Sequence, residues 1–295
     1  MSDGPLVSVV ATCYNGERWI SGALESALGQ TYRNLEVIVV NDGSSDGSAG
    51  VIARYAADTR LRTVEQENKG VAAARNKGLS LASGELVCVL DQDDLWLPGH
   101  VAAQVEFLAA NAGIGAVYTG VERIDAEGSS LGERVFTGPR EGNLFKTFLE
   151  RGVAVPIIGT MIRRSLLEKA GGFDDKLFGK DDFDLLLRLA AETSFGFLPE
   201  RLTLQRFRPG TAGQSEPMYR DSFYLADKFR KLWPEERRTI DKFEAGSRYL
   251  YGSFLLSSGR KAEAREQFSA FLRIGGVCGF PGYLKALIKY LLCYI

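Results

Sequence analysis

Several features that define other protein classes are missing from this 295-residue chain. No uninterrupted apolar run reaches the ~20 residues that span a bilayer, so the sequence predicts no transmembrane helix. The N-terminal residues MSDGPLVSVV contain no basic segment ahead of an apolar stretch, and we expect no signal peptide. The formal net charge is only −1. A nucleic-acid partner therefore has no electrostatic support, and we expect none.

Side chains that bind metals or form disulfides are also scarce. Four cysteines are widely scattered and show no metal-ligand spacing: Cys13, Cys88, Cys278 and Cys293. We interpret them as reduced thiols of a cytosolic protein. The single histidine, His100, begins a predicted helix after Pro98, and we expect it on the surface. No G-x-G-x-x-G fingerprint occurs in the first hundred residues, which argues against a dinucleotide cofactor.

An acidic stretch at the end of a predicted buried strand is the feature around which the chain is organised. Residues 85–90 (ELVCVL) form an apolar, β-rich run that stops at Asp91, Asp93 and Asp94. Like charges this close raise each other's pKa unless a positive group lies among them. Mg²⁺ or Mn²⁺ bridging to a phosphate is the economical partner, and ligands of open α/β sheets bind at the carboxyl ends of strands. A solvated acidic loop before a helix at Pro98 is the alternative.

Strands and helices alternate along the first two thirds of the chain. Over the first hundred residues the pattern predicts strands at 6–11, 35–40, 61–65 and 85–90 and helices at 17–30, 46–57 and 70–81. This spacing predicts βαβ units and a parallel sheet. Further on, the pattern predicts helix 98–110 and strands 115–119, 157–163, 195–198 and 202–207. A second acidic cluster, containing Asp181 and Asp182, opens another helix.

From residue 216 onward the pattern predicts helices only. Residues 247–257 and 261–274 form a helix pair that is similar to one tetratricopeptide-like unit. Solenoids need about three repeats, so we interpret the pair as a packing appendage. Residues 283–295 carry apolar side chains on one face, with Lys285 and Lys289 off that stripe. Such a helix binds a membrane interface, or docks on the body of the protein or on a second subunit, which is the more common outcome.

Five stretches, in order, resemble glycosyltransferase family 2, inverting enzymes of the GT-A fold. They are VSVVATCYNGERWISGALESALGQTY, LEVIVVNDGSSDGS, NKGVAAARNKGLSLASGELVCVLDQDDLW, AGGFDDKLFGKDDFDLLLRLA and LQRFRPGTAGQS. Together they span Val7 to about Gly213. The resemblance implies a Rossmann-like α/β fold with a mostly parallel sheet flanked by helices. We expect a GT-A domain over 1–215, with a nucleotide-binding half (1–100) and an acceptor-binding half (101–215), and an all-helical extension over 216–295.

The resemblance also implies a nucleotide site. Thr12, Tyr14 and Asn15 would contact the base, where a tyrosine can stack on uracil, although an ordinary loop is the alternative. Asp42 would accept a hydrogen bond from the uracil imide, and an Asx-turn role is compatible with this. Arg75 would contact the nucleotide, with a plain helix-surface arginine as the alternative.

The resemblance also implies roles for the acidic stretch and for the last residues of the domain. Asp91 would bind the ribose, Asp93 the metal ion (Mn²⁺ or Mg²⁺), and Asp94 would support the metal site or bind the sugar. Trp96 would wall the sugar pocket, although a large aromatic after a strand is as often core. Arg206 would neutralise the diphosphate.

The second acidic cluster would supply the catalytic base. The resemblance places it at Asp182, preceded by Asp181 where the family has glutamate. Two carboxylates favoured by a helix dipole are the structural alternative. Arg208 stands where the family often has a histidine. A guanidinium can grip phosphate but cannot ligate a metal as imidazole does, so the metal's coordination is open.

The resemblance implies the transfer of one sugar from a nucleotide-sugar, a UDP-sugar first, to a hydroxyl of a glycan or glycolipid acceptor. We expect a cytoplasmic protein, with peripheral contact at the inner membrane face through residues 283–295 and a homodimer as open alternatives. The chain lacks the Q-x-x-R-W sequence and spanning helices of a processive synthase. A nucleotidyltransferase would show a glycine-rich, basic loop after the first strand, where this chain has TCYNGE. A catalytically idle binding module that uses the helical tail for partners is the alternative outside enzymes.

Overall fold

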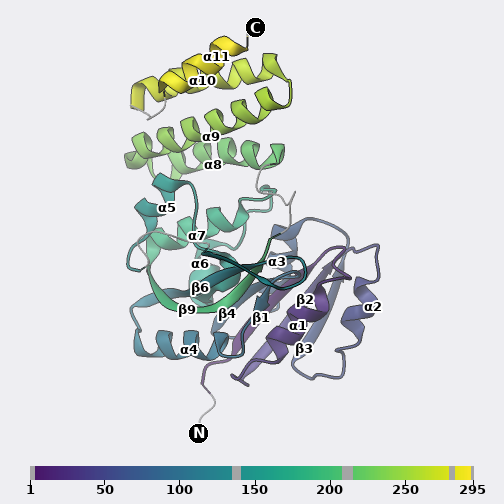
Figure 1. Ribbon diagram of the computed structural model, residues 1–295. Coiled ribbons are helices and arrows are strands. Elements are labelled where there is room, and N and C mark those ends of the chain that lie inside the picture. Colours follow the sequence, from purple (N-terminus) through teal and green to yellow (C-terminus); the bar gives the residue numbers. More distant parts are fainter. Residues whose placement is uncertain (1–3, 135–140, 208–214, 279–282, 294–295) are drawn as a thin grey trace. The chain divides into compact units, whose positions relative to one another are not determined.

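The computed structural model describes residues 4–134, 141–207, 215–278 and 283–293. The chain divides into two compact units (Figure 1). The first contains Met1–Phe145, Ala154–Lys176 and Asp181–Pro209, and the second contains Lys146–Val153, Leu177–Lys180 and Gly210–Ile295. The boundary expected at residue 215 stays a prediction, since two short segments from before that point group with the helical extension.

The first unit is the α/β part of the chain. Its elements are β1 (Val7–Cys13), α1 (Ile20–Leu28), β2 (Leu35–Asp42), α2 (Ser48–Ala53), β3 (Leu61–Gln66), α3 (Val71–Leu79), β4 (Leu86–Asp91), β5 (Leu95–Trp96), α4 (His100–Ala110), β6 (Ile114–Ile124), β7 (Ser130–Arg134), the 3₁₀ turn Ile157–Gly159, β8 (Thr160–Arg163), α6 (Arg164–Ala170), α7 (Asp181–Glu192) and β9 (Ser194–Arg206). The predicted alternation of strands and helices over the first hundred residues is confirmed.

The sheet begins as a parallel sheet and continues as a mixed one. Its strand order is β3-β2-β1-β4-β8-β6-β9-β5, with β7 paired to β6. The pairs among β1 to β4 are parallel, as predicted. β8 runs antiparallel to both β4 and β6, and β5 runs antiparallel to β9. β6 and β9 are parallel to each other. The sheet is therefore wholly parallel from β3 to β4, as expected, and mixed beyond β4.

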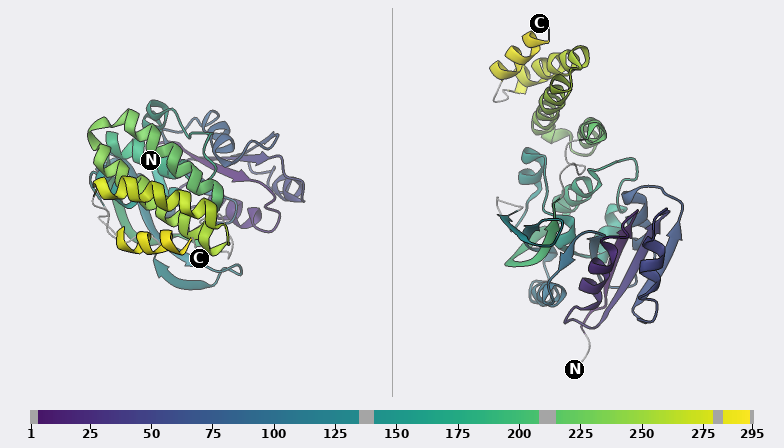
Figure 2. Two further views of the ribbon diagram at one scale, coloured as in Figure 1. Left: turned by 90° about the horizontal axis from the view of Figure 1, so that it is seen from above. Right: turned by 45° about the vertical axis from the view of Figure 1, so that its right-hand side comes forward.

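The parallel strands are covered on both faces because their side chains alternate. Val37 and Val39 of β2 belong to the apolar cluster that includes α1, whereas Ile38 and Val40 pack with Ala74 of α3. α1 and α3 therefore lie on opposite faces of the sheet (Figures 1 and 2). Strands buried on both faces read as near-continuous apolar runs, which is why the sequence pattern located them.

The second unit is helical. It contains most of α5 (Phe145–Arg151), together with α8 (Glu216–Leu232), the 3₁₀ turn Pro234–Glu236, α9 (Arg237–Ser257), α10 (Lys261–Cys278) and α11 (Tyr283–Leu292). α9 begins ten residues before the predicted helix at 247. Among the helices that the structure describes, none is long and apolar enough to cross a bilayer.

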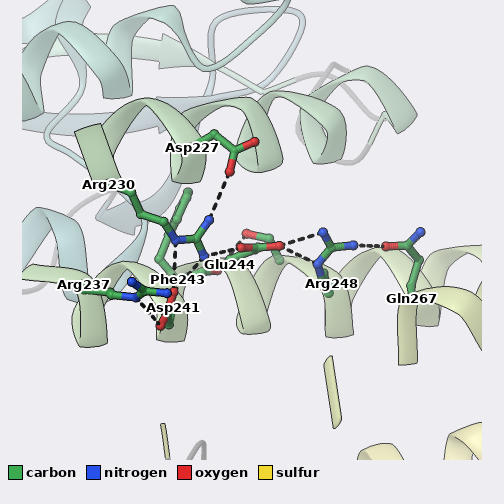
Figure 3. Close-up of polar contacts among 9 residues, drawn as sticks. Asp227, Arg230, Arg237, Asp241, Phe243, Glu244, Arg248 and Gln267 are labelled. Atoms are coloured by element: carbon green, nitrogen blue, oxygen red, sulfur yellow. Dashed lines mark hydrogen bonds and ion pairs between the residues drawn. The ribbon is translucent and has the colours of Figure 1, made fainter. Parts of the chain in front are cut away.

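Ion pairs, together with one hydrogen bond to Gln267, connect three helices of the second unit (Figure 3). Arg230 of α8 pairs with Glu244 of α9 and, at 2.7 Å, with Asp241. Glu244 also accepts from Arg248 at 2.6 Å, and Arg248 in turn donates to Gln267 of α10 at 3.1 Å. Linked charges of this kind hold helices in register more effectively than isolated surface pairs.

Candidate active site

The carboxyl ends of three parallel strands bring the predicted donor residues to one edge of the sheet. Thr12 of β1 is directly paired with Asp91 of β4, and Cys13 is paired with Asn41, the neighbour of Asp42 in β2. The register therefore places Thr12, Asp42 and Asp91 at the same edge, where ligands of open α/β sheets bind.

Asp42 holds the loop that leads into α3. Its carboxylate accepts from Gln66 Nε2 at 2.7 Å and from the backbone N–H groups of Lys69 and Gly70, each at 2.9 Å. The side chain is buried. A carboxylate has about four acceptor positions, so Asp42 keeps capacity for a further donor while it fixes this loop.

The loop after β1 is fixed by contacts from two other strand ends. The Asn15 side-chain oxygen accepts from Ser45 N at 2.8 Å, and the backbone N–H of Asn15 donates to Ser44 Oγ at 3.0 Å. Gln92 binds both polar backbone atoms of Tyr14, at 2.8 Å to its N and 3.1 Å to its O. These contacts leave the Tyr14 side chain 49% exposed. Gln92 was not among the predicted site residues, although its place inside the acidic stretch was an available signal.

Arg75 joins the two acidic clusters. Its guanidinium donates to Asp91 Oδ1 at the end of β4 and to Asp181 Oδ2 at the start of α7, both at 2.7 Å. The arginine is buried and lies 5.3 Å from the Phe173 ring. The helix-surface alternative for Arg75 is therefore wrong. Burial alone would lower the pKa of Arg75, but the charges of Asp91 and Asp181 outweigh it and raise the pKa.

Asp182 is the half-buried acid at the start of α7. Its pKa is raised from an ordinary 3.8 to about 6, first by burial and then by the charge of Asp181, while the charge of Arg75 opposes the shift. Its Oδ1 accepts from Phe183 N at 2.6 Å. Burial also raises the pKa of Asp181, against the lowering effect of Arg75. A carboxylate with a pKa near neutrality is suited to accept a proton during a reaction.

Arg206, at the end of β9, stabilises the acidic stretch through contacts with Asp94 and with backbone carbonyls. The Arg206 backbone N–H donates to Asp94 Oδ1 at 2.8 Å, and its side chain donates to three backbone carbonyls, those of Asp93, Asp125 and Ala126, at 2.7–3.0 Å. Burial, followed by the charges of Asp91 and Asp93, raises the pKa of Asp94 well above its ordinary value. The acids therefore repel one another, as the sequence led us to expect.

The two side chains expected at the sugar, Asp94 and Trp96, are both buried, at 4% and 3% exposed. Asp94 is occupied with Arg206, and the Trp96 Nε1 donates to Ile158 O at 2.7 Å. The sugar-contact role of both residues stays a prediction. Their burial fits the alternatives considered for them, a supporting acid and a core aromatic.

The expectation of a surface position for His100 is wrong. Its ring is fully buried and stacks on Trp96 with ring centroids 4.4 Å apart, and its Nδ1 lies 3.3 Å from Thr203 Oγ1. Burial lowers the pKa of His100 to about 3. The reason is β5, a two-residue strand that the sequence did not predict. It pairs with β9 and draws the following turn against the sheet.

The acidic edge fits a cation that arrives with a phosphate group. Within the described part of the chain, no group of three or more His, Cys, Asp or Glu side chains is placed to hold a metal ion. Mg²⁺ is commonly bound through one or two carboxylates together with substrate phosphates. Hard carboxylate oxygens and the mutual repulsion around Asp94 agree with that arrangement. Arg208, the substitute for the family histidine, lies outside the described residues.

Comparison with known sequences agrees with this architecture. The profile of glycosyl transferase family 2 matches residues 8–171. An uncharacterized glycosyltransferase of Rickettsia bellii (strain RML369-C) is 32% identical over 204 residues, which cover 68% of this chain and 29% of that protein. The chain thus spans under a third of this relative's length. A UDP-Glc:alpha-D-GlcNAc-diphosphoundecaprenol beta-1,3-glucosyltransferase of Escherichia coli is 28% identical over 220 residues, covering 74% of this chain and 83% of the relative.

Comparison with solved structures concerns the fold. S. aureus TarS 1-349 in complex with UDP-GlcNAc has a TM-score of 0.71 at 19% identity, over 98% of this chain and 89% of that one. A mannosyltransferase from Pyrobaculum calidifontis, in complex with GDP-Man and Mn2+, has a TM-score of 0.58 at 23% identity, over 99% of this chain and 86% of that one. The expected GT-A fold with C-terminal helices is confirmed.

Proposed function

The chain belongs to glycosyltransferase family 2, and we propose that it transfers one sugar from a nucleotide-sugar, first a UDP-sugar, to an acceptor hydroxyl with inversion. The observation that supports this most is the link between the two acidic clusters. Arg75 connects Asp91, at the donor edge of the sheet, with Asp181, the residue before Asp182. Arg75 would thereby keep Asp91, which binds the donor, close to Asp182, the proposed base of raised pKa.

In the proposed reaction, the acceptor oxygen attacks the anomeric carbon from the face opposite the leaving nucleotide. The new carbon–oxygen bond forms as the bond to the diphosphate oxygen breaks, and the nucleoside diphosphate leaves with that electron pair. Asp182 takes the hydroxyl proton in the transition state, because a hydroxyl is a poor nucleophile until a base accepts its proton. With a pKa of about 6, Asp182 is mostly ionised at neutral pH.

Different donor-site residues would bind the base, the ribose and the diphosphate of the nucleotide. We assign the exposed Tyr14 ring to stacking on the base, with Thr12 and Asn15 lining that loop, and Asp42 to the imide N–H. We also assign Asp91 to the ribose and the charge of Arg206 to the diphosphate. Because Arg75 is buried between two carboxylates, we assign it to holding Asp91 in place for the nucleotide.

We propose that Asp93 holds Mn²⁺ or Mg²⁺ together with the donor diphosphate. When bound, the cation offsets the negative charge that develops on the departing diphosphate. Asp94 supports this site by accepting a hydrogen bond from the Arg206 backbone N–H, which holds the acidic stretch against the end of β9. Asp93 also lies one residue from Gln92, which fixes the base loop, so the metal and the base would be positioned by one segment.

We propose a glycan or glycolipid acceptor, reached from the cytoplasmic side of a membrane. The Escherichia coli relative acts, by its name, on a diphosphoundecaprenol-linked sugar. In α11, four apolar side chains are 36–56% exposed: Leu287, Ile288, Leu291 and Leu292. Residues 259–295 contain six Lys or Arg and two Glu, in a chain of net charge −1. An apolar face on a cationic segment suits an anionic lipid surface.

Thermal unfolding with nucleotides tests the donor site directly. A ligand present at about a hundred times its Kd stabilises the folded state by about 2.7 kcal/mol. We expect UDP with Mn²⁺ to raise the Tm, UDP without metal to raise it less, and Asp93→Ala to remove the metal-dependent part.

The exposed Asp175→Asn variant serves as the control and should respond as the wild type does. Stabilisation by another nucleotide in place of UDP would contradict the assignment of Asp42 to uracil. Stabilisation by no nucleotide would contradict the transferase proposal. Binding of a UDP-sugar with no turnover would favour the idle binding module.

A further inference from the structure

The segment directly before α7 is held by a single carboxylate of the helical extension. Asp221 of α8 accepts hydrogen bonds from three successive backbone N–H groups, those of Phe178, Gly179 and Lys180, at 3.0, 2.8 and 3.2 Å to its Oδ2. Phe178 N is also 3.2 Å from Oδ1. Asp221 is only 6% exposed. All four residues belong to the second compact unit.

This contact fixes backbone that has no regular structure of its own. Hydrogen bonds from N–H groups to an ionised carboxylate are shorter and roughly twice as strong as neutral ones. Helix α8 also packs closely on the segment, since a Cβ placed on Gly179 would lie 3.1 Å from Met218 Cγ. The Lys180 ammonium lies 5.9 Å from the ring centroid of Phe243 in α9. Two helices of the extension therefore define the conformation of residues 178–180.

The segment matters because it leads directly into the second acidic cluster. Lys180 is joined by a peptide bond to Asp181, and Asp182 is the next residue. We propose that Asp221 is a positioning residue for the proposed base Asp182, acting through the backbone of residues 178–180. This rests on the proposed function. It also gives α8 of the helical extension a part in catalysis, which the sequence did not predict.

The test compares two variants of Asp221 with a matched control on the same helix. Asp221→Asn keeps one acceptor oxygen, and Asp221→Ala keeps none. Asp227→Asn changes an aspartate whose side chain is 76% exposed and pairs only with Arg230 among the ion pairs described. We expect the kcat for sugar transfer to fall at least ~10-fold in Asp221→Ala, because small displacements of a catalytic group are costly. The fall should be smaller in Asp221→Asn, and the donor KM and the Kd for UDP should stay within about twofold in both.

Hydrogen exchange measured on the same proteins separates this proposal from the proposed function. The amides of residues 178–180 should exchange faster in Asp221→Asn than in the wild type, and at the wild-type rate in Asp227→Asn. Unchanged exchange in Asp221→Asn overturns the positioning role, whatever the activity. Faster exchange with unchanged kcat also overturns it. A wild type without transferase activity overturns the proposed function, while the exchange result still reports on the contact. If Asp221→Ala does not fold, Asp221→Asn decides.

Discussion

The guanidinium of Arg75 lies 2.7 Å from one carboxylate oxygen of Asp91 and 2.7 Å from one of Asp181. Asp181 is 3% exposed and Arg75 is 6% exposed at their side chains, so both charges are desolvated. A buried ion pair is weak evidence of net stabilisation, but removal of one partner leaves the other charge buried and uncompensated. At the scale of residues, the site therefore depends on Arg75 for stability as well as for geometry.

Replacement of this arginine should be strongly destabilising. We expect Arg75→Ala to lower the free energy of unfolding by about 3–5 kcal/mol, measured by urea denaturation. The control is Lys169→Ala, which removes an exposed ion pair with Glu192. This substitution should change the free energy of unfolding by at most about 1 kcal/mol. Equal effects of the two substitutions would contradict the buried bridge.

The pH dependence of the rate reports on Asp182. The base works as a carboxylate, so kcat should fall as the pH decreases through the pKa of about 6. Asp181→Asn removes a negative neighbour that raises this pKa. The acidic limb should therefore move to lower pH in Asp181→Asn and stay in place in Asp175→Asn. A shift of the limb to higher pH would contradict the electrostatic account.

Local sequence was enough to locate the acids but not their contacts. Asp91, Asp94 and Asp182 were identified because clustered carboxylates after a strand or at a helix start are visible in a short window. The bond from Gln92 to Tyr14 joins residues 78 positions apart, and the bond from Arg75 to Asp181 joins residues 106 apart. Such contacts depend on tertiary packing, which cannot be inferred from the local pattern of apolar and polar residues. The burial of His100 was missed for the same reason.

At the scale of elements, long periodic segments were predictable and short or irregular ones were not. β1, β2 and β4 were located because they are continuous apolar runs. β9 was predicted as two strands because Pro199 interrupts the pattern, whereas the structure absorbs it in a bulge, where Leu198 pairs with Thr119 and Arg201 with Gly120. β5 has only two residues, too few for a periodic signal.

The exposed face of α11 supplies a prediction at this scale. The wild type should co-sediment with vesicles that contain phosphatidylglycerol and much less with phosphatidylcholine alone, because the segment is cationic. The combined change Leu287→Ser, Ile288→Ser and Leu291→Ser should abolish the binding. Leu250→Ser, at a residue of α9 that is 57% exposed, should not. Unchanged sedimentation, or a change in oligomeric state of the triple variant instead, would contradict a lipid partner.

At the scale of the whole molecule, a GT-A fold is combined with a helical unit. The order of five weak motifs predicted the fold class. The first three motifs contain the ends of β1, β2 and β4, which the sheet brings to one edge. The extent of the second unit was less predictable. Residues 146–153 and 177–180 group with it through contacts that are distant in sequence. The family model matches residues 8–171, all of which precede the helical extension that begins at residue 216.

Release of UDP from UDP-sugars in the presence of acceptor, measured for the wild type and Asp182→Asn, tests the central claim most directly. General-base catalysis contributes typically 10²–10⁴-fold. The account predicts that Asp182→Asn binds UDP and Mn²⁺ as the wild type does and releases UDP at least ~100-fold more slowly, while Asp175→Asn keeps the wild-type rate. An Asp182→Asn variant that turns over at the wild-type rate would contradict the account.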